Sequence, residues 1–71
     1  MTKEELLRLQ SYLRKTFGSK NLTVRARPKK DDSAEVYMGD DFIAVLFREE
    51  EDGEVSYQFQ MAILELDLED A

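Results

Sequence analysis

The chain contains no cysteine and no histidine, with one proline and three glycines among 71 residues. Without cysteine it has no disulfide, and without histidine the commonest zinc ligand is missing. A domain of this size buries only about 60% of the surface that its unfolded chain exposes, and small domains often supplement their core with disulfides, metals or oligomerisation. Of these three routes we expect oligomerisation.

Long apolar runs are also missing. No run approaches the roughly 18 to 20 residues of a membrane span, and the N-terminal stretch lacks the basic and then apolar order of a secretory signal. The absence of cysteine fits a reducing compartment. We therefore expect a single cytoplasmic domain, residues 1–71, that does not associate with membranes.

Signatures of catalysis and of cofactor binding are absent from the sequence. Nucleophilic catalysis needs a hydroxyl or thiol beside a base, usually histidine. The paired carboxylates stand in predicted turns, and the acidic stretch at residues 49–54 lacks the ligand spacing of a calcium loop. No glycine-rich phosphate-binding motif is present. We expect no enzyme, no catalytic residue, no cofactor and no metal.

The net charge of −6 conceals a division along the chain. Residues 1–30 carry nine Lys or Arg against two Glu, a balance of +7, whereas residues 31–71 carry one Arg against fourteen Asp or Glu, a balance of −13. Such asymmetry indicates either an interaction tail or two halves that fold onto each other. We favour the second interpretation because both halves show apolar periodicity.

A helix is predicted over residues 3–17. Thr2 and Glu5 form a capping-box pattern before it, and Gly18 stands where a left-handed residue ends a helix. Apolar residues recur at spacings of three and four, which gives one stripe for packing. They are Leu6, Leu9, Leu13 and Phe17, flanked by Tyr12.

After Gly18 the apolar period changes to two, which is typical of β-strands. The predicted fold is α+β, with the N-terminal helix packed on one face of a four-stranded antiparallel meander sheet. The predicted strands are residues 22–28, 34–38, 41–48 and 54–66.

The reversal of charge near residue 30 falls at the first predicted hairpin. Pairing its strands around a loop at residues 29–33 places Arg27 opposite Glu35 and Arg25 opposite Tyr37. Opposite charges directly across two strands stabilise a sheet by a few tenths to about 1 kcal/mol. This pairing explains much of the reversal.

The next two turns set the faces of the third strand. A two-residue type II′ turn at Gly39 and Asp40 places Val36 opposite Ile43, and a three-residue turn ending at Gly53 places Phe47 opposite Tyr57. With this register, the side chains that face the helix from the third strand are those of Ile43, Val45 and Phe47. The side chains that face away from the helix are those of Phe42, Ala44 and Leu46.

The third strand is apolar on both faces, whereas one helix covers only one of them. We therefore expect a non-enzymatic protein-interaction module that binds itself as a homodimer, or binds another protein, through the second face. The predicted interface residues are Tyr37, Phe42, Ala44, Leu46, Leu64 and Leu66.

The alternation of the fourth strand slips after Ile63, and two explanations compete. A β-bulge near Ala62 or Ile63 would return Leu64, Leu66 and Leu68 to the helix side. Without a bulge these leucines extend the second face. We favour the second explanation because the third strand already makes that face apolar.

A basic patch offers an alternative function, weak binding of nucleic acid or another anionic ligand. Its residues are Arg25, Arg27, Lys29 and Lys30, with Tyr37 available for stacking. The negative net charge opposes it at long range, and Asp31, Asp32 and Glu35 compete for the same cations. Homodimerisation is therefore the favoured hypothesis.

The stretches "RPKKDDSAEVY" and "FQMAIL" resemble a small family of uncharacterised alphaproteobacterial proteins, domain of unknown function DUF3126. The resemblance covers nearly the whole chain. It implies a stand-alone bacterial domain of this length and carries over no activity, ligand or catalytic residue.

Overall fold

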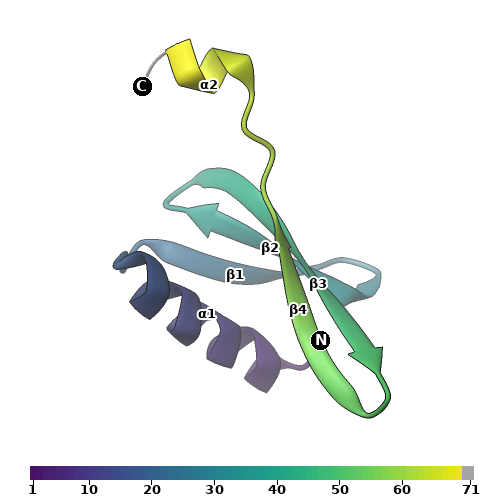
Figure 1. Ribbon diagram of the computed structural model, residues 1–71. Helices are drawn as coiled ribbons and strands as arrows, with labels where there is room; N and C mark the ends of the chain where they lie inside the picture. The colour runs from purple at the N-terminus through teal and green to yellow at the C-terminus, as the bar shows by residue number, and fades with distance from the viewer. Residues whose placement is uncertain (70–71) are drawn as a thin grey trace.

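The computed structural model describes residues 1–69 as a helix, a four-stranded sheet and a short second helix (Figure 1). The elements are α1 (Lys3–Phe17), β1 (Leu22–Arg27), β2 (Lys30–Met38), β3 (Asp41–Glu51), β4 (Glu54–Gln60) and α2 (Glu65–Glu69). Neighbouring strands are antiparallel in the order β1-β2-β3-β4, and α1 lies along one side of the sheet. The predicted α+β fold, with one helix on a four-stranded meander, is confirmed.

Helix α1 begins and ends as its sequence predicts. The Thr2 hydroxyl accepts a hydrogen bond from the backbone N–H of Glu5 (3.1 Å), and the Glu5 carboxylate accepts one from the N–H of Thr2 (3.0 Å). Gly18 ends the helix with φ at +63°, and its N–H donates to the carbonyl of Arg14. These contacts satisfy backbone groups that a helix terminus would otherwise leave unpaired.

The core lies between α1 and the face of the sheet that α1 covers. Leu6 and Leu9 pack against its edge, while Phe17 is half exposed and its ring lies 5.7 Å from that of Phe59. The buried apolar residues come from α1 and from three strands: Leu13, Leu22, Val24, Ala34, Val36, Ala44 and Leu46.

The first hairpin is tighter than predicted. β2 begins at Lys30 instead of residue 34, because Lys29 adopts a φ of +63° and closes the turn directly after Pro28. Arg25 therefore lies opposite Glu35, and Arg27 lies opposite Lys30. The predicted pairs are wrong: Arg25 was expected opposite Tyr37, two residues from its partner, and Arg27 opposite Glu35, five residues from its partner. An irregularity after Ala26 absorbs the three additional residues of β2, 31–33.

A bulge in β3 inverts the predicted faces of that strand. The two-residue turn at Gly39 and Asp40 is confirmed, with Gly39 at φ +61° and Met38 paired with Asp41. Tyr37 lies opposite Phe42, but Val36 lies opposite Ala44, so that Ile43 is an additional residue without a partner on β2. Because side chains alternate with a period of two, one additional residue moves every following side chain to the other face.

The prediction for β3 is therefore wrong from Ala44 onward. Ala44 and Leu46 lie in the core, each 2% exposed, whereas Val45 and Phe47 lie on the face away from α1. Ile43 packs against the core, as predicted.

The β3–β4 turn has two residues instead of the predicted three. Glu51 pairs with Glu54, and the residues between them, Asp52 and Gly53, both have positive φ (+53° and +82°). This is the signature of a type I′ turn, which aspartate followed by glycine favours. Phe47 consequently lies opposite Gln58 instead of Tyr57.

The C-terminal arm, which we define as residues 61–69, leaves the sheet. β4 ends at Gln60 instead of residue 66, and the arm leads to α2, which lies apart from the sheet and α1 (Figure 1). Both explanations offered for the slipped alternation are wrong, because Leu64, Leu66 and Leu68 neither return to the helix side nor extend the second face. They are 60%, 65% and 63% exposed. Among residues 1–69, no helix combines the length and apolar character needed to cross a membrane.

Candidate functional site: the uncovered sheet face

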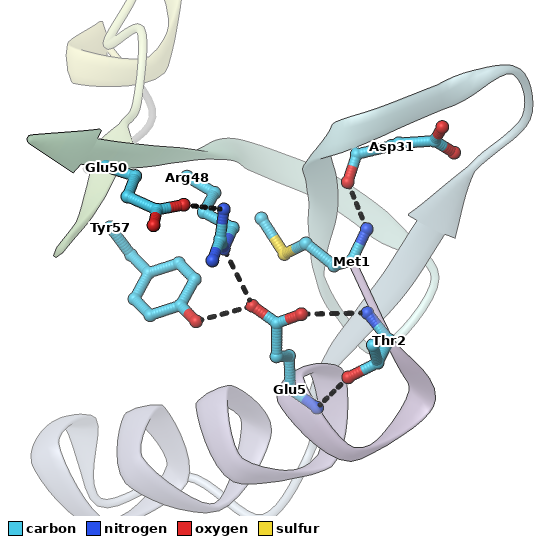
Figure 2. Close-up of polar contacts among 7 residues, drawn as sticks. All are labelled: Met1, Thr2, Glu5, Asp31, Arg48, Glu50 and Tyr57. Carbon is cyan, nitrogen blue, oxygen red and sulfur yellow. Dashed lines mark hydrogen bonds and ion pairs between the residues drawn. The ribbon is translucent and has the colours of Figure 1, made fainter. Parts of the chain in front are cut away.

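A polar cluster fixes α1 over the β3–β4 hairpin (Figure 2). The Glu5 carboxylate, on the first turn of α1, accepts hydrogen bonds from the Tyr57 hydroxyl (2.7 Å) and from Nε of Arg48 (3.1 Å). Arg48 also donates from Nη1 to Glu50 (3.2 Å). Glu5 thus serves two purposes, since its other oxygen caps the helix at Thr2. The sequence indicated only the capping role, because Arg48 and Tyr57 are distant from Glu5 in the chain.

Hydrogen bonds to the charged form of Glu5 explain its acidity. The backbone N–H of Thr2, followed by the hydroxyl of Tyr57, lowers the pKa of Glu5 from 4.5 to about 2. The same bond raises the pKa of Tyr57, because the hydroxyl proton is shared with a carboxylate. These groups are directed at one another, so the cluster positions α1 over the β3–β4 hairpin.

With α1 fixed on one side, the opposite side of the sheet presents an apolar stripe. We call this side the uncovered face and define its stripe as Tyr37, Phe42, Val45 and Phe47. Val45 and Phe47 are half-buried among neighbouring strands, while Phe42 is 54% exposed. Polar side chains flank the stripe at paired positions: Arg25, Glu35, Gln58 and Gln60.

Aromatic contacts order one end of the stripe. The rings of Tyr37 and Phe42 meet edge to face, with centroids 5.7 Å apart. The guanidinium of Arg25 lies 4.0 Å from the centroid of the Tyr37 ring, and the Tyr37 hydroxyl donates to Glu35 (3.2 Å). Cation–π and edge-to-face contacts hold such rings in defined orientations. This end of the face is therefore a preformed surface.

The predicted interface residues fall into three places. Tyr37 and Phe42 lie on the uncovered face. Ala44 and Leu46 are buried in the core, so they cannot contact a partner, and their inclusion was wrong because of the bulge at Ile43. Leu64 and Leu66 lie on the C-terminal arm. Val45 and Phe47, which the predicted register placed under the helix, take the positions assigned to Ala44 and Leu46.

A groove opens where β3 loses its neighbour. The ladder between β3 and β4 stops at Val45 and Gln60, so the β3 residues 41–44 have a strand partner only on the β2 side. The departing arm forms the other wall. The groove has a volume of about 810 Å³, and its apolar lining includes Phe42, Ile43, Val45, Phe59, Met61 and Leu64.

A second hollow lies on the covered side, between α1 and the β3–β4 hairpin. Its volume is about 410 Å³, and its lining includes Leu9, Tyr12, Leu13, Leu46 and Phe59. Glu5 and Tyr57, from the polar cluster, also contribute to its wall. The hollow exists because α1 packs chiefly over β1 and leaves the far side of the sheet partly open.

Residues 5–67 match the sequence profile of the family described as "Protein of unknown function (DUF3126)". The chain belongs to this family. The match spans 63 of the 71 residues, from the helix-capping Glu5 to the arm residue Asp67. Neither curated proteins nor solved structures gave a match to the chain.

The basic residues of this DUF3126 chain are brought together only in part. Lys29, in the turn, and Lys30, at the start of β2, are exposed at the tip of the first hairpin. Arg27 lies opposite Lys30 but donates to the hydroxyl of Ser33 (3.3 Å). Arg25 lies on the uncovered face over Tyr37. Within residues 1–69, no cluster of three or more acidic side chains is arranged to hold a metal ion.

Proposed function

We propose that this chain is a small non-enzymatic interaction module that forms a homodimer through the uncovered face. The observation that supports the proposal is the apolar stripe opposite α1. Its exposed aromatic residue, Phe42, is held against Tyr37, and Tyr and Phe are enriched at the centres of protein interfaces. Polar side chains flank the stripe, as they do at the rims of protein interfaces.

The size of the chain supports the same conclusion. The buried core is built from a few aliphatic side chains, among them two alanines, and the chain forms no disulfide. Association of two copies would remove further apolar surface from water at about 25 cal/mol per Å². Two-fold symmetry, in which both copies use the same surface, is the commonest arrangement in soluble homo-oligomers.

Light scattering coupled to size-exclusion chromatography tests the proposal. The informative variant is Phe42→Glu, which places a charge on the stripe at a site that is half exposed and therefore tolerant in a single copy. The matched control is Leu7→Glu, which makes the same kind of change at 56% exposure on α1. We expect dimers for the wild type and for Leu7→Glu, and monomers for Phe42→Glu. A wild type that remains monomeric at high micromolar concentration would refute the homodimer.

Binding of nucleic acid or another anion remains a second candidate function, favoured by the exposure of Lys29 and Lys30 at one hairpin tip. Arg25 and Arg27 lie on the adjoining strand, although both already have contacts. Binding of this kind weakens steeply with salt because it releases counterions. A salt-dependent affinity for mixed RNA or DNA that falls in the Lys29→Gln, Lys30→Gln double variant would support this candidate. Absence of binding at low salt would eliminate it.

A further inference from the structure

The C-terminal arm is the largest exposed apolar segment among the described residues, and its own sheet does not cover it. We propose that two copies exchange their arms, so that Leu64, Leu66 and Leu68 of each copy pack on the uncovered face of the other. This inference rests on the proposed homodimer and assigns the segment that forms its interface.

The register of the sheet shows why the arm needs a second copy. Val45 lies opposite Gln60, so a continued β4 would place Asp41, the first residue of β3, opposite Leu64. Residues 65–69 would then extend beyond the end of β3. Even with a fully formed strand, Leu66 and Leu68 would find no partner strand in their own sheet.

The pattern of the arm fits an extended conformation better than a helix. From Leu64 to Glu69, leucines alternate with Glu65, Asp67 and Glu69, which gives a strand one leucine side and one acidic side. Helix α2 has only five residues and buries none of them. Helices this short are marginal in water, because nucleation is costly and packing supplies most of the stability. The arm can therefore extend when a partner surface is available.

The uncovered face complements the leucine side of an extended arm. Val45 and Phe47 recur on β3 at the same two-residue spacing as the leucines, and the groove beside Phe42 has an apolar lining. Arg25 lies exposed at the rim of this face, where it can meet the acidic side chains of the arm.

Exchange of the arms would bury apolar area that is exposed in a single copy. The leucines of the arm are 60–65% exposed: Leu64, Leu66 and Leu68. At roughly 100 Å² of apolar area for each complete side chain, the leucine side of one arm offers about 190 Å². The leucine sides of two arms and the surfaces that they cover amount to about 750 Å² of apolar area, to which the backbone and the acidic side chains of the arms add polar area.

The absence of cysteine allows a direct test in the full-length chain. One preparation carries Leu66→Cys and a second, with a tag of different size, carries Gln58→Cys on the uncovered face. Each chain then has one cysteine, so a disulfide within a chain is impossible and the mixed product is identified by its size. We expect the mixed disulfide to form readily on mild oxidation. The control replaces Gln58→Cys by Thr16→Cys, at an exposed position on α1. Equal yields with both partners would show random collision and would overturn the exchange.

A second measurement separates this inference from the proposed homodimer. The double variant Leu66→Glu, Leu68→Glu changes only exposed residues, so folding is preserved, and its dimer dissociation constant is measured beside that of the wild type. We expect the constant to rise at least about 100-fold, because four leucines per dimer lose their apolar contacts. An unchanged constant would refute the exchange of arms and leave the homodimer intact. A monomeric wild type would refute both.

Discussion

Replacing Glu5 by glutamine isolates the charge that joins α1 to the sheet. Glutamine occupies nearly the same volume, and its amide oxygen can still accept the hydrogen bond from the N–H of Thr2, so the helix cap is retained. The change removes the negative charge that Tyr57 and Arg48 contact. We therefore expect a loss of stability that arises from the α1–hairpin contact and not from fraying of the helix.

The magnitude and its pH dependence follow from the acidity of Glu5. A pKa near 2 instead of 4.5 corresponds to about 3 kcal/mol of preference for the carboxylate in the folded state. The hydrogen bond from Thr2, which glutamine keeps, is the largest cause of this preference, and water screens the side chain, which is 22% exposed; we therefore expect a loss of about 1 kcal/mol at neutral pH. Because the folded-state pKa lies below the unfolded value, the contribution is complete above pH 4.5 and disappears as the pH falls towards 2.

The assay is urea unfolding followed by far-UV circular dichroism at fixed protein concentration, from pH 7 down to pH 2. A chain of 71 residues has a stability of roughly 4 to 10 kcal/mol, so a loss of about 1 kcal/mol is resolved. The difference between the wild type and Glu5→Gln should shrink below pH 4.5 and vanish near pH 2. The matched control is Glu4→Gln, which removes the same charge from an exposed neighbour on α1. A difference that stays constant from pH 6 to pH 3 would refute the role assigned to Glu5.

The inverted faces of β3 lead to two further predictions. Leu46→Ala should lower the free energy of unfolding by about 2 to 4 kcal/mol and Val45→Ala by only about 1 kcal/mol, because Leu46 is buried and Val45 is not. Urea unfolding of both variants measures the two losses. A larger loss for Val45→Ala would contradict the register. Deletion of Ile43 should leave a folded chain that is less stable by about 1 to 2 kcal/mol, because it removes the additional residue of the bulge and the contacts that this side chain makes with the core. Complete unfolding of the chain on deletion of Ile43 would contradict a bulge at this residue.

The elements that the sequence predicted correctly are those specified by local chemistry. The bounds of α1 follow from Thr2, Glu5 and Gly18, whose contacts are made within one helical turn. The turn at Gly39 was likewise predictable, because glycine tolerates the positive φ that a two-residue turn requires. The meander order followed from the short connections between strands.

The predicted register of the strands was wrong, because the sequence pattern is compatible with more than one pairing of the same strands. β3 is apolar at every position from Phe42 to Phe47, so either set of alternating residues could face the helix and no pattern marked Ile43 as the residue of a bulge. Positive φ at Lys29 and Asp52 also went unpredicted, since such residues adopt it less often than glycine. Each of these local choices shifted the pairing of neighbouring strands.

The candidate site was predictable in location but not in composition. The expectation that one side of the sheet lacks a helix depended on the number of elements, whereas the residues on that side depended on the bulge. Because of the bulge, Val45 and Phe47 lie on the uncovered face in place of Ala44 and Leu46. Val45 and Phe47 are larger than Ala44 and Leu46, but Leu64 and Leu66, which were predicted to extend this face, lie on the C-terminal arm instead. Phenylalanine contributes strongly to protein interfaces, so the apolar character of the uncovered face depends on Phe42 and Phe47 instead of on Leu46.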